Sequence, residues 1–279
     1  MLIPFKLLID QTDRCLQNKC LRIIEEDARK ILKEKPEIVF LNFFQGPGLK
    51  DSLYLAELLK KERPALKIIG VGMRISWFRE YSAYLSRNID AYVIGSHSDT
   101  TLIKLSAGEA YENIPNLIFT DKYGKIIYTG LSLEQDLDAL GLPDYRKETY
   151  QGIEHKILFF EINLTSEACP FQCNFCVRPI NYGTKWVKRN IENIVDEIEH
   201  LVANFNARYF RISDSTPPAG MLTEVAEEII KRGLNKKISY SCFSRCYQKP
   251  VEDFQLLKKS GCEAIFLGIE SGSQKILDE

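Results

Sequence analysis

The sequence predicts an α/β protein with two parallel sheets: an N-terminal doubly wound, Rossmann-like sheet and then a partial (β/α) barrel. Short apolar runs alternate with amphipathic segments along the chain. Several runs are almost continuously apolar, as buried parallel strands are, and one polar stretch separates two series of them. The predicted boundaries are residues 1–129 for the first domain, 130–155 for a linker and 156–279 for the partial barrel.

Composition points to an ordinary globular protein, because 45% of the 279 residues are hydrophobic and 27% are charged. Lys and Arg number 37 against 38 Asp and Glu, so no global field attracts nucleic acid or an anionic membrane. The apolar start reaches Asp10 too soon for a signal peptide, and no run approaches the roughly 18 apolar residues of a membrane span. We therefore expect a soluble, cytoplasmic protein without a membrane partner, and the charge balance weakens an RNA-modifying role without excluding it. Eight cysteines, three of them clustered, favour a reducing compartment and metal binding over disulfides.

The first domain alternates apolar runs with segments that carry apolar residues at helical spacing. The predicted strands are 6–10, 37–44, 66–71 and 89–95, and the predicted helices are 13–34, 52–62, 77–88 and 99–107. An antiparallel pair, 114–119 and 125–129, should turn at residues 121–124. In such sheets ligands bind beyond the carboxyl ends of the parallel strands.

The second domain reads as short strand–helix repeats of a parallel barrel, whose functional groups gather at the carboxyl ends of its strands. The predicted strands are 157–162, 208–214, 237–242 and 263–270, and the predicted helices are 191–205, 222–232 and 251–260. The sequence stops nine residues after Glu270, which leaves room for only four strands. An unpaired strand edge and an open cavity are expected, so either the sequence is a fragment or another chain completes the barrel.

Three cysteines, Cys169, Cys173 and Cys176, lie within eight residues just after the first strand of this domain. Three thiolates can hold three irons of a cubane cluster and leave the fourth iron open to another ligand. A metal with an open position is a reaction site, and Phe175 would help to keep water away from it. The alternatives are a zinc site, which usually needs four N or S ligands, or three unrelated buried thiols.

The pattern C-x-x-x-C-x-aromatic-C after a strand resembles the signature of the radical S-adenosylmethionine superfamily, and the order of domains resembles its cobalamin-binding-domain-containing branch. The resemblance implies a [4Fe-4S] cluster on Cys169, Cys173 and Cys176, with S-adenosylmethionine chelating the open iron. In that family one electron from the cluster breaks a carbon–sulfur bond and gives a 5'-deoxyadenosyl radical. A flavodoxin-type or ferredoxin-type reductant is therefore an expected partner, and Phe175 is expected to contact the cofactor.

The first domain is similar to the cobalamin-binding module of this branch, which has a Gly-Gly turn near residues 70–72 and a G-E-G-E turn near 95–98. Neither turn is matched fully, and the D-x-H-x-x-G motif that supplies an imidazole to cobalt is absent. Family members can bind cobalamin without that histidine, so binding and non-binding both stay open. Glycines at strand–helix turns are also expected for backbone reasons alone.

Three residues at strand ends of the second domain match the family's cofactor positions. Asp214 resembles the position that receives the ammonium of S-adenosylmethionine, and Arg245 resembles the basic position near its carboxylate. Glu270, in the segment G-I-E-S-G-S, resembles the strand end that meets the ribose or methionine. The alternatives are a helix-capping Asp and a solvated Arg, whereas a carboxylate that closes an apolar strand is rarely a core residue.

These features predict a radical S-adenosylmethionine enzyme that abstracts hydrogen from an unactivated carbon of a small-molecule or peptide substrate. If cobalamin binds, methyl transfer to that carbon is the expected outcome. A rival enzyme is a methylthiotransferase that modifies tRNA, but its N-terminal three-cysteine cluster has no counterpart in this sequence. From a different class, the chain could be a catalytically silent iron–sulfur or cobalamin carrier.

Overall fold

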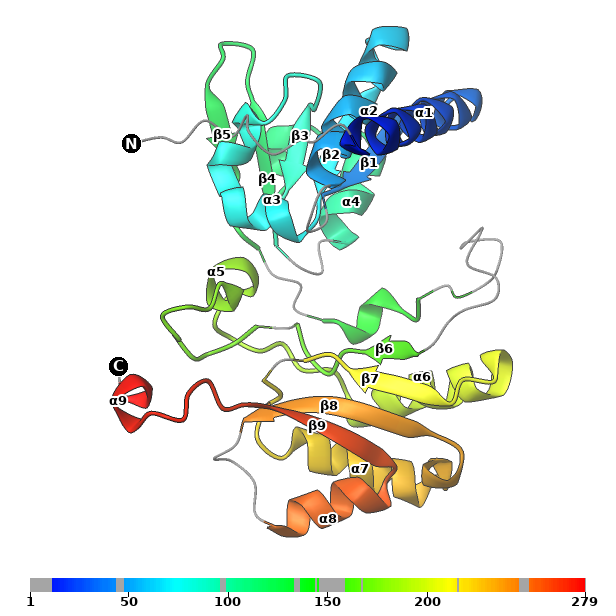
Figure 1. Cartoon of the computed structure of the whole chain (residues 1–279), viewed down its shortest axis with the longest axis vertical. Coiled ribbons are helices and arrows are strands. Elements are labelled where there is room, and N and C mark those ends of the chain that lie inside the picture. Colours follow the sequence, from blue (N-terminus) through cyan, green and yellow to red (C-terminus); the bar gives the residue numbers. More distant parts are fainter. Residues whose placement is uncertain are drawn as a thin grey trace. The chain divides into compact units, whose positions relative to one another are not determined.

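The computed structural model describes residues 12–43, 48–95, 99–132, 136–143, 145, 159–166, 168–214, 216–245 and 251–278. The chain divides into two compact units, Met1–Ser132 (unit 1) and Leu133–Glu279 (unit 2), drawn in Figure 1. The strand predicted at residues 6–10 lies outside the described residues.

Unit 1 holds a five-stranded sheet in the order β1-β2-β3-β4-β5. Its strands are β1 (Ile38–Asn42), β2 (Lys67–Val71), β3 (Ala91–Val93), β4 (Leu117–Thr120) and β5 (Ile126–Tyr128). Its helices are α1 (Thr12–Lys33), α2 (Gly48–Glu62), α3 (Met73–Phe78) and α4 (Asp99–Ser106), with 3₁₀ turns at Arg79–Tyr84 and Tyr111–Asn113. Strands β1 to β3 are parallel, whereas β4 and β5 form the predicted antiparallel hairpin.

The helix predicted at residues 77–88 is wrong in its form. Helix α3 ends at Phe78, and a separate 3₁₀ turn follows from Arg79 to Tyr84. Arg79 has φ 48°, which lies outside the right-handed helical region, so the α-helix cannot continue through it. The buried Ser82 hydroxyl donates back to the carbonyl of Ile75 at 3.2 Å and holds the turn against α3.

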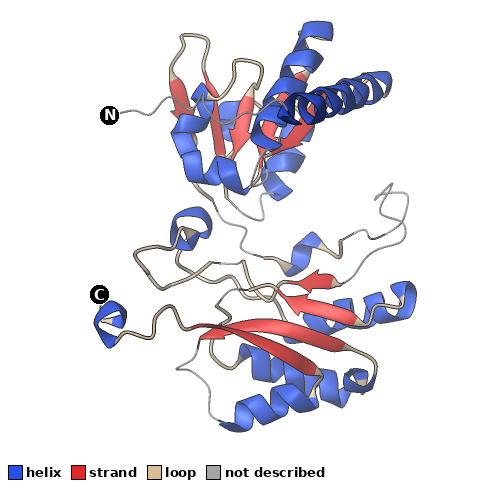
Figure 2. Ribbon diagram, viewed as in Figure 1, coloured by secondary structure: helices blue, strands red, loops and turns tan. Residues whose placement is uncertain are grey.

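Helices cover both faces of the unit 1 sheet (Figure 2). Neighbouring residues of a strand point to opposite faces, and accordingly Ile68 and Ile69 belong to different cores. Ile68 packs in the core that Leu59 of α2 enters, and Ile69 packs in the core that Leu105 of α4 enters. This arrangement confirms the α/β class predicted for the N-terminal sheet.

Unit 2 holds a second sheet, in the order β6-β7-β8-β9, with every neighbouring pair parallel. Its strands are β6 (Phe160–Ile162), β7 (Tyr209–Ile212), β8 (Ser239–Arg245) and β9 (Cys262–Gly268). Its helices are α5 (Arg178–Tyr182), α6 (Ile191–Phe205), α7 (Met221–Lys231), α8 (Val251–Lys259) and α9 (Gln274–Leu277), with 3₁₀ turns at Asp138–Leu140 and Leu234–Lys236. Parallel strands with intervening helices confirm the predicted partial barrel.

Helices α6, α7 and α8 cover one face of this sheet, as Figure 1 shows. Alternate strand residues, among them Ile162, Ile212 and Cys242, meet these helices in one core. The intervening residues face the opposite side, where Phe266 is 46% exposed. Among the described strands, β9 pairs only with β8 and therefore has a free edge.

The predicted linker is divided between the units: residues 130–132 belong to unit 1, and the described residues 136–143 and 145 belong to unit 2. The ring of Tyr145 meets the ring of Phe160 edge-on, with 5.2 Å between centroids. One carboxylate oxygen of Asp138 accepts a hydrogen bond from the backbone N–H of Asn190 at 2.8 Å, at the start of α6. This segment therefore contributes to the side of unit 2 from which the loop after β6 arises.

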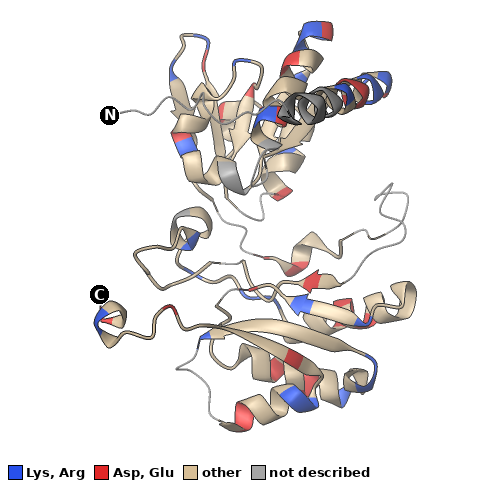
Figure 3. Ribbon diagram, viewed as in Figure 1, with Lys and Arg blue, Asp and Glu red and all other residues tan. Residues whose placement is uncertain are grey.

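Charges of both signs are interleaved on the helices, for example along α1 (Figure 3). This distribution matches the near balance of 37 basic and 38 acidic residues in the whole sequence. Within the described ranges, no helix combines the length and the apolar character that crossing a bilayer requires.

Candidate cofactor site

The segment between β6 and α6, residues 163–190, carries the three-cysteine motif, and we call it the cysteine loop. Cys169 is buried, Cys173 and Cys176 are half-buried, and all three are free thiols. The described residues contain no group of three or more His, Cys, Asp or Glu side chains gathered closely enough to share a metal ion. The structure thus places the three thiols on one loop without closing them round a single point.

Backbone hydrogen bonds fold the cysteine loop onto itself. The N–H of Cys176 donates to the carbonyl of Cys173 at 2.9 Å, which makes a turn between the second and third cysteines. The N–H of Cys169 donates to the carbonyl of Gly183 at 3.2 Å, so the first cysteine is tied to the residue after α5. Pro179 stands in the first turn of α5, where the missing N–H costs nothing.

The two ends of the cysteine loop pair as a short antiparallel ladder. Ser166 donates its N–H to the carbonyl of Val187 at 2.9 Å, and Arg189 donates its N–H to the carbonyl of Leu164 at 2.9 Å. The hydroxyl of Ser166 also accepts from the N–H of Val187 at 3.1 Å. These bonds close the base of the loop beside the carboxyl end of β6.

A buried ion pair holds the same base. Arg189 Nη1 lies 2.8 Å from Glu197 Oε2 of α6, with side-chain exposures of 13% and 4%. The same guanidinium nitrogen donates to the carbonyl of Asn163 at 3.0 Å. Arg189 Nε also lies 3.6 Å from Asp138 Oδ1. Nothing local in the sequence distinguishes Arg189 from the neighbouring Lys185 and Lys188, so this buried ion pair could not be predicted.

Asp214, the predicted ammonium-binding residue, lies two residues after the end of β7 and is 1% exposed. One carboxylate oxygen accepts from the N–H of Leu164 at 2.5 Å, and the other accepts from the hydroxyl of Thr165. Both donors begin the cysteine loop. The structure therefore assigns Asp214 an anchoring contact with the loop, and its contact with the cofactor stays a prediction.

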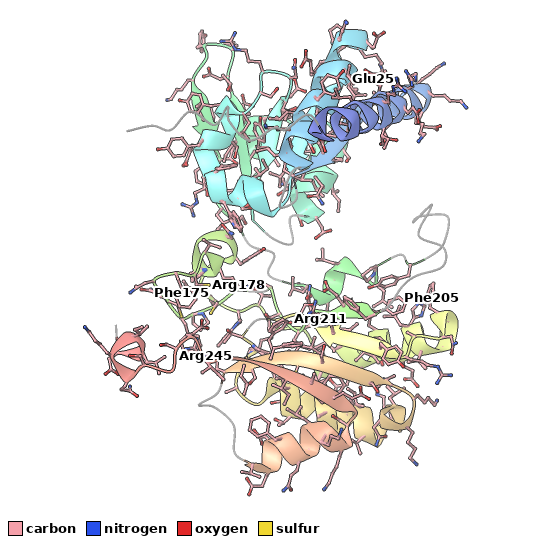
Figure 4. The ribbon with its side chains drawn as sticks, viewed as in Figure 1. Glu25, Phe175, Arg178, Phe205, Arg211 and Arg245 are labelled. Carbon is pink, nitrogen blue, oxygen red and sulfur yellow. The ribbon has the colours of Figure 1, made fainter. Side chains whose placement is uncertain are left out.

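Arg245, the predicted carboxylate-binding residue, ends β8. Its guanidinium carbon lies 4.0 Å from the centroid of the Phe171 ring, a residue of the cysteine loop between the first and second cysteines. The side chain is half-buried, and Figure 4 shows it near the carboxyl end of the sheet. The structure thus brings this predicted site residue together with the loop that carries the thiols.

Glu270 and Phe175, the other two predicted cofactor residues, are exposed. Glu270 adopts φ 62°, a left-handed conformation that is uncommon for glutamate. A Cβ added to Gly268 would lie 2.8 Å from Glu270 Oε1, so the absence of a side chain at Gly268 makes room for this carboxylate. Phe175 is 69% exposed, so its ring does not shield the three thiols from water in this structure, although its position in the motif led us to expect such shielding.

Arg211 is a feature that sequence analysis did not single out as functional. It lies on the helix-free face of the sheet, with its guanidinium carbon 5.4, 5.6 and 5.9 Å from the ring centroids of Phe159, Phe243 and Phe266 (Figure 4). Its Nη1 is 3.8 Å from Glu161 Oε1. The sequence does contain a sign of this role, because the charged Arg211 stands between Phe210 and Ile212 in an otherwise apolar strand.

Two further thiols lie on the opposite, helix-covered face. Cys242 and Cys262 are buried, and their sulfurs are 3.9 Å apart. The hydrogen bond with Cys242 lowers the pKa of the Cys262 thiol and outweighs the opposing effect of burial. Because Cys242 packs in the helix core, this pair is separate from the cysteine loop.

Several buried polar atoms of unit 2 have no hydrogen-bond partner, which indicates whether these residues fit a bound cofactor. Among the described residues, Asn163 Oδ1, Trp186 Nε1, Ser213 Oγ and both amide atoms of Asn181 are buried without a hydrogen bond. These residues lie in the cysteine loop or directly after β7, where the cofactor is expected. Native proteins pair most such groups, so this concentration fits a site that is completed by a bound group.

Two glycines of unit 1 are used for packing. A Cβ at Gly70 would lie 2.5 Å from the Tyr92 ring. Gly72, with φ 107°, leaves no space for a Cβ beside Asn42 and the backbone of Phe43. Packing within unit 1 is therefore sufficient to explain why both positions are glycine. His97, in the predicted G-E-G-E region, lies outside the described residues.

Comparisons with known proteins agree with this architecture. Residues 163–279 match the model of the Radical SAM superfamily. The uncharacterized methyltransferase PH0819 of Pyrococcus horikoshii is 24% identical over 259 residues, which cover 90% of this chain and 56% of that protein. Cytidylyl-2-hydroxyethylphosphonate methyltransferase of Streptomyces wedmorensis is 23% identical over 294 residues, covering 91% and 54%. The chain spans about half the length of these curated relatives.

Two solved structures share the fold. The radical S-adenosylmethionine methyltransferase TsrM from Kitasatospora setae, with tryptophan substrate and an S-adenosylmethionine analogue bound, gives a TM-score of 0.72 at 17% identity, covering 90% of this chain and 52% of TsrM. The cobalamin-dependent S-adenosylmethionine radical enzyme OxsB, with aqua-cobalamin and S-adenosylmethionine bound, gives 0.68 at 18% identity, covering 91% and 38%. Residues 163–279 thus carry the match to the Radical SAM superfamily, and the chain as a whole shares the fold of TsrM and OxsB.

Proposed function

We propose that this protein is a cobalamin-dependent radical S-adenosylmethionine enzyme that transfers a methyl group to a carbon of a small-molecule substrate. The observation that carries the proposal is the set of three free thiols, Cys169, Cys173 and Cys176, on a loop that follows the first of four parallel strands. The loop lies within the segment that matches the superfamily. When bound, a [4Fe-4S] cluster with S-adenosylmethionine supplies one-electron chemistry and a methyl group.

The residues of this chain would bind, orient and shield that group. The three thiols would ligate iron as thiolates, and Asp214 holds the start of their loop through Leu164 and Thr165. We propose that Arg245 attracts the carboxylate of the methionine moiety, as a guanidinium suits a planar anion.

We also keep three predicted cofactor contacts as proposals. Glu270 would meet the ribose or methionine, Asp214 would meet the ammonium, and Phe175 would exclude water once the loop closes on its cofactor. Exclusion of water strengthens each electrostatic contact in such a site.

The proposals of cobalamin binding and methyl transfer are supported by the similar proteins. Structures of TsrM with cobalamin and of OxsB with aqua-cobalamin share the fold of this chain. The matched curated proteins include several methyltransferases, which favours methyl transfer over methylthiolation of tRNA. The tryptophan substrate of TsrM supports a small molecule as the substrate here. A flavodoxin-type or ferredoxin-type protein would supply the electron, and the cytoplasm is the proposed compartment.

The test is anaerobic purification of the full-length protein followed by iron, sulfide and corrinoid assays and an optical spectrum. We expect about four irons per chain, as one cubane cluster requires. The triple variant Cys169→Ala, Cys173→Ala, Cys176→Ala should lose them. Cys262→Ala is the matched control, because this buried thiol lies on the helix-covered side of the sheet and should leave iron content unchanged.

Turnover then separates an enzyme from a carrier. After reduction with S-adenosylmethionine present, formation of 5'-deoxyadenosine or of S-adenosylhomocysteine supports the enzyme. A wild-type protein without iron, or with zinc on the three thiolates, contradicts the proposal. Iron binding with neither product identifies a non-catalytic carrier instead.

A further inference from the structure

Asn181 is a buried amide that the fold leaves without a partner. It lies on α5 within the cysteine loop and is 2% exposed. In the part of the chain that the structure describes, neither its Oδ1 nor its Nδ2 makes a hydrogen bond. Exchanging the two amide atoms does not change this, because both are unpaired. Burial of an unpaired amide costs about 1–3 kcal/mol by mutational measures, so a partner from outside the chain is expected.

The position of Asn181 points to the kind of partner. Its backbone N–H donates to the carbonyl of Val177, the residue after Cys176, at 3.1 Å. Two residues after Asn181, the carbonyl of Gly183 accepts from the N–H of Cys169 at 3.2 Å. Asn181 therefore lies between Val177, which follows the last cysteine in the chain, and Gly183, whose carbonyl binds the N–H of the first cysteine.

A group bound by the three thiols would present sulfur atoms to this helix. Sulfide and thiolate sulfurs carry negative charge and accept hydrogen bonds, and an asparagine amide offers two N–H donors. Arg178, on the same helix, instead lies over the ring of Tyr182, 5.3 Å from its centroid. Within α5, Asn181 is thus the buried side chain with free donors.

We propose that the Asn181 side-chain amide donates a hydrogen bond to a sulfur of the iron–sulfur cluster and raises the reduction potential of the cluster. The physical reason is that reduction adds negative charge to the cluster, and an N–H dipole directed at sulfur stabilises that charge. This inference rests on the proposed function, because it requires a cluster on the three thiols.

The first test compares the cluster-free protein with Asn181→Leu. Leucine has a similar size and removes an unpaired polar group, so the melting temperature of the cluster-free variant should equal or exceed that of the wild type. Asn116→Leu is the matched control, because the Asn116 amide is buried and bonded to Ser132 N–H, to Ser132 C=O and to Thr101. That control should melt at a lower temperature. A comparable loss in Asn181→Leu would show a structural amide and overturn the proposal.

The second test measures the midpoint potential of the reconstituted cluster by redox titration with electron paramagnetic resonance detection. Asn181→Leu should shift the potential to more negative values. Asn181→Asp, which keeps the shape but replaces the donors by a carboxylate, should shift it further. The Asp variant also serves if the Leu variant does not fold. Potentials equal to wild type in the variants overturn the proposal.

Failure of this inference differs from failure of the proposed function. If the wild-type protein holds no cluster, the proposed function itself fails. If the wild type holds a cluster and the Asn181 variants match its potential, only the hydrogen bond to sulfur is wrong. Asn116→Leu, which lies in unit 1, should leave the cluster potential unchanged.

Discussion

The guanidinium carbon of Arg245 lies 4.0 Å from the centroid of the Phe171 ring. A cation above an aromatic face is attracted by the ring quadrupole, with about 0.5–2 kcal/mol depending on solvent exposure. Phe171 belongs to the cysteine loop, whereas Arg245 ends β8. The direction of the guanidinium and the position of the loop therefore depend on each other.

Replacing Phe171 by Leu should weaken binding of S-adenosylmethionine to the reconstituted protein by about two- to thirtyfold, the equivalent of a lost cation–π contact. The cause would be a guanidinium that is no longer held toward the carboxylate. Equilibrium dialysis with labelled cofactor measures the change. Phe171→Tyr keeps the aromatic face and should bind normally, and Phe254→Leu on α8 is the control. Equal affinities for Phe171→Leu and wild type would contradict the prediction.

Replacing Arg189 by Met should lower the free energy of unfolding by about 3–5 kcal/mol, because Glu197 would keep a buried charge without its partner. Chemical denaturation of the cluster-free protein measures this loss. Adding Glu197→Gln should recover part of it, since the uncompensated charge is then gone. Lys30→Met removes the exposed pair with Asp27 and should cost less than about 1 kcal/mol. Similar losses in both single variants would argue against a buried pair.

Replacing Gly261 by Ala should destabilise unit 2 more than replacing Gly233 by Ala. Both glycines have positive φ, 103° and 68°. A Cβ at Gly261 would lie 2.7 Å from the carbonyl oxygen of Ile238, which is backbone and cannot rotate away, whereas a Cβ at Gly233 meets nothing within 4 Å. Gly233→Ala should therefore cost only the left-handed conformation, roughly 1–2 kcal/mol. Urea denaturation compares the two, and equal losses would contradict the steric reason.

Stability should fall as pH rises from about 10, the pKa of tyrosine in an unfolded chain, toward 12. Burial, and to a smaller degree the Asp90 carboxylate, raise the pKa of Tyr111 to about 12. In this interval the unfolded chain releases the proton and the folded protein keeps it, so deprotonation favours unfolding. Tyr111→Phe should reduce the slope of the unfolding free energy against pH. Tyr92→Phe should reduce it as well, because burial also raises the pKa of Tyr92. An unchanged slope in Tyr111→Phe would contradict the assignment.

Local patterns in the sequence were enough to predict most strands and helices and the cysteine loop. The runs around Ile68 and Phe210 are apolar because they are buried between or beneath helices, so burial of these strands can be recognised from a single sequence. The helix predicted at residues 77–88 was wrong because Arg79 has φ 48° and ψ −127°, which lie outside the helical region, and arginine as a residue type gives no sign of this conformation.

The sequence by itself determined that three thiols would lie on a loop after a buried strand, because their spacing and the preceding apolar run are local properties of the chain. Only the tertiary structure decided that Asp214 holds that loop and that Asn181 is buried without a partner. It also placed Arg211 among three aromatic rings. The physical reason is that hydrogen bonding and burial depend on neighbours distant in sequence, such as Leu164 and Asp214, which are 50 residues apart.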